Sequence, residues 1–230
     1  MNVTAVITAG GSGKRFGTPT PKQFLPLLGL PILVRSVQAF ERCTEVEEIV
    51  ITVPEAQLAS YNPSTFHSYD IRKVVKAIVG GESRQESVHL GLRAIDWPCD
   101  VVAIHDASRP LIHGKLISAS LLSLEGWDGS VVAVPVHDTL KEVSSPPKID
   151  RTVERTHLWA MQTPQVFRFP WILKAYDQAA KDSFRATDDA QVAERFGGKV
   201  RVLEGDPRNL KITFNNDLRM AEALLKGEVE

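Results

Sequence analysis

Residues 3–28, VTAVITAGGSGKRFGTPTPKQFLPLL, decide the fold, because in this stretch an apolar run passes directly into a loop rich in glycine and cations. The apolar run is typical of a strand buried on both faces of a parallel sheet. Glycines lack a Cβ atom, so the backbone N–H groups of such a loop approach and bind anions. The loop therefore predicts a cradle for a polyanion such as a triphosphate. Its glycines are Gly10, Gly11, Gly13 and Gly17, and its cations are Lys14, Arg15 and Lys22.

Two familiar glycine motifs do not match this loop. A Walker A loop needs a glycine where the chain has Thr8, and a serine or threonine where it has Arg15. A dinucleotide fingerprint needs a small residue in place of Phe16. The loop therefore either forms only a tight strand exit or holds phosphates in another arrangement. The cations packed beside the glycines favour phosphate binding.

The composition is that of an ordinary soluble protein, with 43% hydrophobic and 24% charged residues in 230. We expect residues 1–230 to form one domain, because no linker or low-complexity tract divides them. A net charge of -1 argues against a nucleic-acid partner, which would need a basic excess.

The two cysteines, Cys43 and Cys99, show no pairing pattern and no CxxC motif, which argues against a disulfide scaffold or a zinc site. The sequence has no basic and apolar leader and no apolar run of membrane-spanning length. We therefore expect a cytoplasmic protein without a membrane partner, or one of the plastid stroma if a transit peptide has been removed.

Strand and helix patterns alternate after the glycine loop. This alternation predicts an α/β fold with a doubly wound, mostly parallel sheet. The expected strands cover residues 49–53, 74–79, 101–104, 131–134 and, near the end of the chain, 200–203.

Two further strand ends carry residues suited to a ligand. The segment GGESRQES, residues 80–87, joins two glycines to a helix start, with Ser83 as the expected cap and Ser87 facing the same crevice. The segment HDASRP places Asp106 at a strand end, with Arg109 just beyond it. An aspartate in that position is also a common turn residue, so this signal is weaker by itself.

The pattern changes over residues 136–160, which alternate like a β-hairpin around the turn at 144–147 and contain little core material. We expect this arm to lie against the twofold-related subunit of a homodimer, because a long exposed edge is usually covered. The alternative is a surface hairpin without a partner. Farther on, Thr187-Asp188-Asp189 predicts a helix N-terminus, and Asn215 or Asn216 is expected to cap the last helix.

The chain closely resembles the 2-C-methyl-D-erythritol 4-phosphate cytidylyltransferase family of the non-mevalonate isoprenoid pathway, and the resemblance spans nearly its whole length. The most specific matches are Pro21-Lys22-Gln23, the pair His105-Asp106 followed by Arg109-Pro110, and Gln162-Thr163-Pro164-Gln165. The matching segments, in order, are TAGGSGKRFGTPTPKQF, GGESRQESV, HDASRP, VPVHDTLK, ERTHLWAMQTPQVF, TDDA and NLKIT.

The resemblance implies a Rossmann-like nucleotidyltransferase that joins CTP to 2-C-methyl-D-erythritol 4-phosphate and releases pyrophosphate. It also implies Mg²⁺ or another divalent cation, held mainly by the CTP phosphates with no protein ligand assigned. The family resemblance further implies a homodimer whose hairpin arms interlock.

The resemblance also implies a role for individual residues. Asp106 belongs to both the nucleotide and the substrate set, and Arg155 is expected to act across the dimer. The catalytic set is Arg15, Lys22, Arg155 and Lys211; the nucleotide set is Ala9, Gly10, Gly11, Gly80, Gly81, Glu82, Ser87 and Asp106; the substrate set is Asp106, Arg109, Thr139, Arg155, Thr163, Thr187 and Lys211.

Three positions depart from the family pattern. Glu82 and Glu154 stand where aspartate is frequent, and Gly10 stands where a second alanine is expected. Glu154 keeps the charge but has a longer reach, so its contact in the arm is less well defined than that of Arg155.

Two other functions remain open from the residues alone. A ribitol-5-phosphate cytidylyltransferase would have a similar body and would also use CTP. A nonenzymatic nucleotide-sensing protein on the same fold would bind CTP without releasing pyrophosphate, and it would leave Lys22, Asp106 and Lys211 without a shared purpose.

Overall fold

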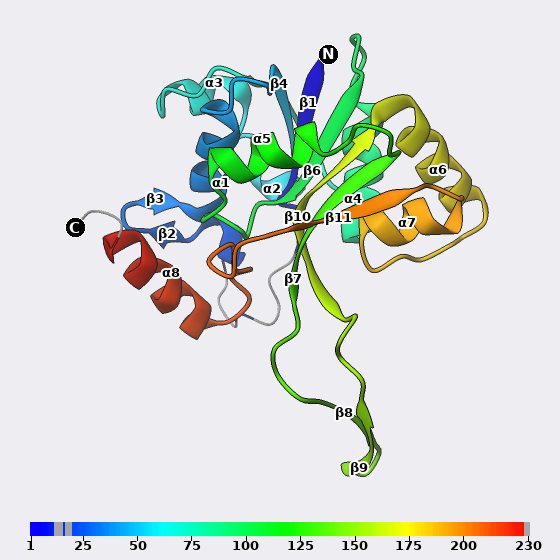
Figure 1. The fold of residues 1–230 in the computed structure, drawn as a ribbon. Helices are drawn as coiled ribbons and strands as arrows, with labels where there is room; N and C mark the ends of the chain where they lie inside the picture. Colours follow the sequence, from blue (N-terminus) through cyan, green and yellow to red (C-terminus); the bar gives the residue numbers. More distant parts are fainter. Residues whose placement is uncertain (12–15, 17–19, 228–230) are drawn as a thin grey trace.

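The computed structural model describes residues 1–11, 16 and 20–227, and a seven-stranded sheet lies at the centre of this part of the chain (Figure 1). The strand order is β11-β7-β10-β6-β1-β4-β5. Only β10 runs antiparallel to its neighbours. The strands are β1 (Val3–Thr8), β4 (Glu48–Val53), β5 (Val74–Val79), β6 (Val101–Asp106), β7 (Gly129–Pro135), β10 (Trp159–Arg168) and β11 (Val200–Glu204).

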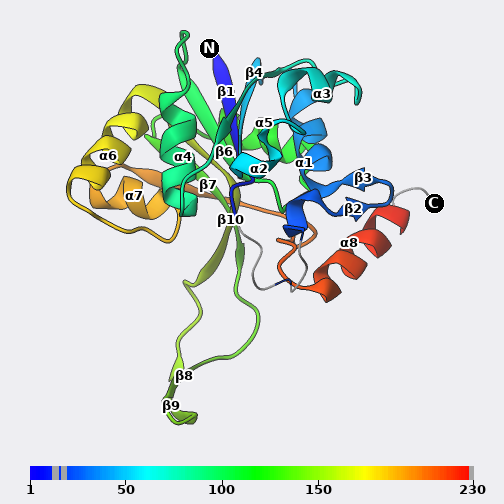
Figure 2. The ribbon, with the colours of Figure 1, turned by 180° about the vertical axis from the view of Figure 1, so that it is seen from behind.

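Helices cover both faces of the sheet, which confirms the predicted doubly wound fold (Figures 1 and 2). The first face carries α1 (Ile32–Glu41), α3 (Pro63–His67) and α5 (Gly114–Leu122), and the opposite face carries α4 (Arg84–Arg93), α6 (Phe169–Lys181) and α7 (Asp189–Arg195). The shorter elements are η2 (Lys22–Phe24), β2 (Pro26–Leu27), β3 (Leu30–Pro31) and α2 (Glu55–Leu58).

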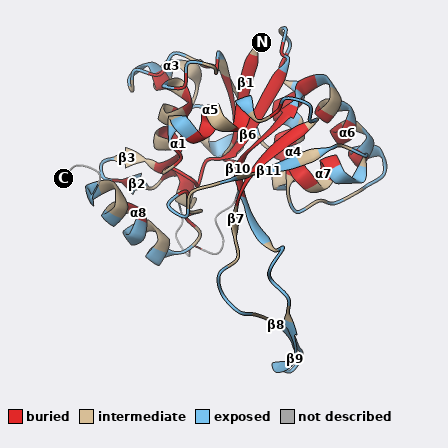
Figure 3. Cartoon of the chain, in the orientation of Figure 1, coloured by how far each residue is buried: buried red, intermediate tan, exposed pale blue. Residues whose placement is uncertain are grey.

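The apolar run of β1 explains its central position. Val3, Ala5 and Ile7 lie in the core under the first face, whereas Val6 lies in the core under the opposite face. All four side chains are buried, as are most of the central strands in Figure 3. A strand buried on both sides needs this nearly continuous apolar sequence, because successive side chains point to opposite faces of the sheet.

Helix α4 begins as predicted. The Ser83 side chain accepts a hydrogen bond from the Glu86 N–H at 3.1 Å, but the Glu86 carboxylate accepts from the N–H of Glu82 rather than that of Ser83. Gly91 lets the helix lie close to the sheet, because a Cβ atom at this position would stand 2.6 Å from Val6 Cγ1. The expected N-terminus of α7 is also confirmed, since the Asp188 side chain accepts from the Gln191 N–H.

The predicted cap of the last helix is wrong. Helix α8 (Asn215–Gly227) begins at Asn215, and the Asp217 carboxylate accepts from the N–H groups of Thr213 and Phe214 instead. An ionised carboxylate binds these N–H groups more strongly than an amide oxygen would. The helix packs through Ala221 on a small core beside β2 and β3.

The predicted hairpin is present as β8 (Leu140–Ser144) and β9 (Lys148–Val153), which pair antiparallel. It projects from the body below β7 and β10 (Figures 1 and 2). Its surface is exposed (Figure 3), and Val143 and Ile149 show 56% and 61% of their area to solvent. Its role as a dimerisation arm stays a prediction.

Both cysteines, Cys43 and Cys99, are free and buried. Within residues 1–11, 16 and 20–227, no helix combines the length and apolar character needed to cross a membrane.

Candidate active site

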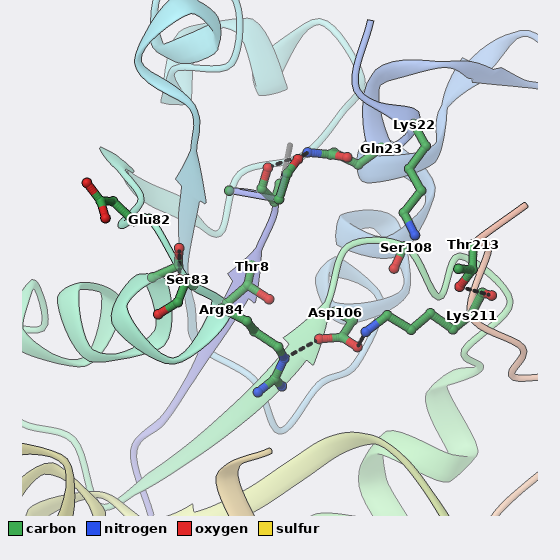
Figure 4. A pocket seen from close by; sticks show the side chains of 14 residues that line it. Thr8, Lys22, Gln23, Glu82, Ser83, Arg84, Asp106, Ser108, Lys211 and Thr213 are labelled. Carbon is green, nitrogen blue, oxygen red and sulfur yellow. Dashed lines mark hydrogen bonds and ion pairs between the residues drawn. The ribbon is translucent and has the colours of Figure 1, made fainter. Parts of the chain in front are cut away.

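A pocket of about 290 Å³ lies where the strands β1, β5 and β6 end. Backbone hydrogen bonds continue the sheet into its walls: Ala9 N–H donates to Thr52 O at 2.7 Å, and Gly80 N–H donates to Val53 O at 2.8 Å. The carboxyl edge of a parallel sheet is where doubly wound folds bind ligands. The described lining residues are Thr8, Ala9, Gly10, Gly11, Lys22, Gln23, Glu82, Ser83, Arg84, Ser87, Asp106, Ser108, Lys211 and Thr213 (Figure 4).

The two predicted glycine segments meet at one wall. A Cβ atom added to Gly10 would lie 2.7 Å from Ser87 Oγ, and one added to Gly80 would lie 2.9 Å from the same atom. Ser87 Oγ accepts from the Gly81 N–H at 3.1 Å and donates to Ser83 O at 2.9 Å. In this chain glycine at position 10 therefore leaves room for the Ser87 hydroxyl. An alanine, which the family pattern leads one to expect here, would place its Cβ atom too close to that hydroxyl.

Gln23 holds the described part of the glycine loop in place. Its amide donates to Ala9 O at 2.6 Å and to Gly11 O at 2.8 Å, and the side chain is buried. Two hydrogen bonds from one buried amide fix the carbonyl directions of the loop and thereby the orientation of its peptide units. Lys22 precedes Gln23 in η2, so the same short helix delivers both the anchor and a cation to the pocket.

Lys22 and Lys211 reach the pocket from separate parts of the chain (Figure 4). Lys22 Nζ donates to the carbonyl of Ile212, next to Lys211 in sequence. Lys211 Nζ donates to Asp106 Oδ2 at 2.6 Å. The Ile212 N–H in turn donates to Ser108 O at 2.8 Å, which ties this C-terminal segment to the loop after β6.

Asp106 is buried among cations. Arg84 Nε donates to its Oδ1 at 2.7 Å, Lys211 donates to its Oδ2, and Arg109 Nε lies 3.9 Å from Oδ2. Burial alone would raise the pKa of Asp106, but the charges of Arg84, Lys211 and Arg109 outweigh it and hold this pKa well below the ordinary range. Asp106 is thus a permanent carboxylate that orients cations, and it is unsuited to act as a general base.

A second layer fixes Asp106 from behind. Its N–H donates to Thr163 Oγ1 at 3.1 Å, and Thr163 Oγ1 lies 2.9 Å from His105 Nδ1. His105 Nε2 lies 3.2 Å from the carbonyl of Arg109, which can only accept, so Nε2 carries the proton and Nδ1 accepts from Thr163. Burial lowers the pKa of His105 to about 3 and keeps the ring neutral.

The structure divides the predicted site residues into groups. Gly80 and Gly81 lie against the pocket wall, and Arg109 and Thr163 lie beneath it, where Arg109 donates to the carbonyls of Asn209 and Met161. Those that line the pocket are Ala9, Gly10, Gly11, Lys22, Glu82, Ser87, Asp106 and Lys211.

The remaining predicted residues are not brought into this lining. Thr139 and Arg155 are exposed at the base of the arm, where Arg155 donates to the carbonyl of His137. Thr187 is exposed and bonds Gln191. Arg15 lies outside the described residues.

Sequence reasoning did not identify Arg84 or Gln23 as pocket residues. Arg84 stands inside the quoted GGESRQES segment, and Gln23 stands inside the quoted Pro21-Lys22-Gln23 motif, so the signal in each case was proximity to a residue already singled out. The partner of Arg84 could not be foreseen, because it is Asp189, 105 residues away in the sequence.

The donor set suits phosphate oxygens rather than a metal ion. Among the described residues, no group of three or more His, Cys, Asp or Glu side chains gathers as a metal cage. Both oxygens of Asp106 already accept from cations.

A doubly wound sheet with glycines and cations around a pocket at its carboxyl edge is typical of nucleotide-binding α/β proteins. The family model for 2-C-methyl-D-erythritol 4-phosphate cytidylyltransferase matches residues 3–227. The chain therefore belongs to the 2-C-methyl-D-erythritol 4-phosphate cytidylyltransferase family.

Individual relatives agree. The chain is 43% identical to the enzyme of that name from Symbiobacterium thermophilum, over 98% of this chain and 94% of the relative, and 42% identical to that of Geotalea uraniireducens, over 99% and 98%. The crystal structure of the enzyme of the same name from Thermus thermophilus superposes with a TM-score of 0.82 at 29% identity, covering 98% of this chain and 100% of that chain. The structure of 4-diphosphocytidyl-2C-methyl-D-erythritol synthase from Anaerococcus prevotii gives a TM-score of 0.85 at 26% identity, covering 98% and 96%.

Proposed function

We propose that this protein transfers the cytidylyl group of CTP to 2-C-methyl-D-erythritol 4-phosphate, giving 4-diphosphocytidyl-2-C-methyl-D-erythritol and pyrophosphate. The observation that carries this proposal is the meeting of Lys22, Lys211 and the glycine wall of Gly10 and Gly80 around one pocket. Family membership supplies the two substrates, and the pocket supplies the charge that their reaction needs.

The reaction forms one bond and breaks another. An oxygen of the substrate phosphate attacks the α-phosphorus of CTP. The bond between the α-phosphorus and the oxygen that bridges it to the β-phosphorus breaks, and pyrophosphate leaves. The attacking phosphate is already anionic at neutral pH, so it needs no general base. This agrees with a carboxylate at Asp106 that is held by Arg84 and Lys211 and does not take up a proton.

The principal obstacle is the repulsion between two polyanions. Lys22 and Lys211 are suited to compensate the charge that gathers on the nonbridging and leaving oxygens, together with Arg15 of the glycine loop. Mg²⁺ bound by the phosphates would add positive charge at the same place. Ser87 and the backbone of Gly80 and Gly81 would hold the cytosine, because a hydroxyl and peptide groups can pair with its exocyclic amine and ring edge.

The hairpin is proposed to complete the site of a second subunit. Arg155 and Thr139 lie at its base, exposed and outside the lining of their own pocket, and Val143 and Ile149 present apolar area without a described partner. A twofold dimer would cover this area and bring Arg155 toward the partner's substrate phosphate. In this proposal residues 1–230 form one nucleotidyltransferase domain, 136–160 form its arm, and Thr187 approaches the substrate in the complex.

The products test the proposal directly. Phosphorus NMR of a reaction with CTP and methylerythritol phosphate should show the paired resonances of a new diphosphate diester together with free pyrophosphate. CTP that stays intact although it binds would instead indicate a nucleotide-sensing protein.

A further inference from the structure

A chain of buried charges continues behind the pocket. Arg84, the first residue of α4, donates from Nη1 and Nη2 to the two carboxylate oxygens of Asp189 at 2.9 and 2.7 Å. Tyr176 on α6 donates from its hydroxyl to Asp189 Oδ1 at 2.5 Å. The Nε of the same Arg84 side chain donates to Asp106 at 2.7 Å. One guanidinium therefore joins the Asp106 carboxylate, which faces the pocket, to the Asp189 carboxylate, which lies behind it.

The helix dipole does not explain why Arg84 stands at the N-terminus of α4. A cation at a helix N-terminus opposes the helix dipole, so Arg84 gains nothing there from α4. Asp189 is fully buried and Tyr176 nearly so, and an unpaired carboxylate at such a position would be very costly. The planar fork of arginine can contact two carboxylates at once, which the single ammonium of a lysine does less well.

We propose that Arg84 is a positioning residue of the transfer reaction: anchored by Asp189 and Tyr176, it fixes the Asp106 carboxylate so that Asp106 holds Lys211 toward the reacting phosphates. This inference rests on the proposed function. It gives Asp189 and Tyr176, which do not line the pocket, a part in turnover.

A purely structural ion pair between α4 and α7 is the competing explanation, and a pH profile separates the two. The charged and titratable groups facing Asp106 are Arg84 from α4, Lys211 from the C-terminal segment, Arg109 from the loop after β6 and neutral His105 from β6. Burial raises the pKa of Asp106, and the neighbouring cations lower it. Removal of Arg84 takes away one of these cations, so the pKa of Asp106 should rise. Turnover that depends on the Asp106 carboxylate would then fall away at a higher pH than in the wild type.

The main variant is the double replacement Arg84→Gln with Asp189→Asn. It removes both charges together, so the Asp189 carboxylate is not left unpaired and Asp106 keeps Lys211. We therefore expect the double variant to fold, which circular dichroism checks. Arg84→Lys and Tyr176→Phe are measured beside it. The matched control is Arg93→Gln, which removes an exposed arginine from the other end of α4, where it lies 3.8 Å from Asp177.

The proposal predicts that kcat of the double variant falls by roughly tenfold to a hundredfold, as misplacement of a catalytic group does. The Kd for CTP should change much less, and the acid limb of the kcat profile should move to higher pH. Arg84→Lys should recover part of kcat, Tyr176→Phe should lower it slightly, and the control should match the wild type.

The proposal is overturned if the folded double variant keeps the kcat and acid limb of the wild type, or if kcat and thermal stability fall together with no change in the pH profile. A wild-type protein that releases no pyrophosphate would instead refute the proposed function, so the two failures are distinguishable.

Discussion

At the scale of a residue, Lys22 shows how a short segment places a positive charge in the pocket. Pro21 precedes it in extended backbone, Gln23 anchors the loop behind it, and its ammonium contacts the Ile212 carbonyl across the pocket. The lysine thus links the first and last pocket segments before any ligand binds. A group positioned in advance costs no reorganisation when charge develops in the transition state.

Lys22→Ala should lower kcat by about a hundredfold or more, because one preorganised electrostatic donor is lost. The Kd for CTP should change less, since the glycine wall and the other cations remain. Steady-state turnover and a direct nucleotide-binding assay measure the two effects. Lys174→Ala, at an exposed position on α6, is the matched control and should behave as the wild type. A Lys22→Ala protein with near-normal turnover would remove this lysine from the mechanism.

At this scale the sequence indicated the pocket but not its supports. The glycines and Lys22 could be identified from the loop after the first strand, and Asp106 from its place at the end of a strand. Lys211 was expected only through the family resemblance. Gln23 and Arg84 act through contacts with distant or backbone partners, which no local pattern encodes. Thr163 was expected to line the substrate site, whereas in the isolated chain it supports the Asp106 backbone.

Helix α4 joins the fold to the site at the scale of an element. Its first turn carries Arg84 and Ser87, and its last turn lies against β1 and β4 at Gly91. The position of the helix relative to the sheet therefore sets the distance between the two glycine segments. We therefore expect a substitution at Gly91 to alter the pocket, although this residue does not line it.

Gly91→Ala should destabilise the fold and lower turnover. The added Cβ would stand 2.6 Å from Val6 Cγ1 and 3.3 Å from Thr52 Cγ2. Overpacking of this kind costs about 1–3 kcal/mol, which exceeds the gain of up to about 1 kcal/mol from the better helix propensity of alanine. Urea unfolding measures the free-energy change.

The matched control for this prediction is Gly114→Ala in the first turn of α5. No described atom lies within 4 Å of a Cβ added there, so the free energy of unfolding should stay the same or rise. Equal stability of the Gly91→Ala and Gly114→Ala proteins would show that α4 does not depend on close contact at Gly91.

The long elements could be predicted because their periodicity is strong, and the strand ends at Val53, Val79 and Glu204 differ from expectation by one residue at most. The short elements α2, α3, β2 and β3 could not, since two to five residues carry too little pattern. Strand β10 was not among the expected strands. Its antiparallel direction could not be foreseen either, because a strand pattern does not encode the direction of the strand in the sheet.

At the scale of the whole molecule, the arm is the feature that a single chain leaves unexplained. Its strands pair with each other and not with the central sheet, and its exposed apolar residues have no described partner. A shared site in a homodimer accounts for both observations. The sequence pattern predicted the hairpin, but neither the pattern nor the isolated chain shows where a partner lies.

Mixing of inactive subunits tests the shared site. After dissociation and reassociation, Lys22→Ala and Arg155→Ala subunits should form heterodimers with one intact site, built from Lys22 of one chain and Arg155 of the other. The control is a mixture of Lys22→Ala and Lys211→Ala, which should stay inactive because both lysines serve the pocket of their own chain. Confirmed heterodimers without recovered activity in the first mixture would exclude the exchange of Arg155.

The central claim is tested most directly by the rate of pyrophosphate release from CTP with methylerythritol phosphate, measured beside ribitol 5-phosphate, no acceptor, and the other nucleoside triphosphates. We expect rapid release only when CTP and methylerythritol phosphate are both present. Faster release with ribitol 5-phosphate, or no release with any acceptor, would contradict the proposed activity.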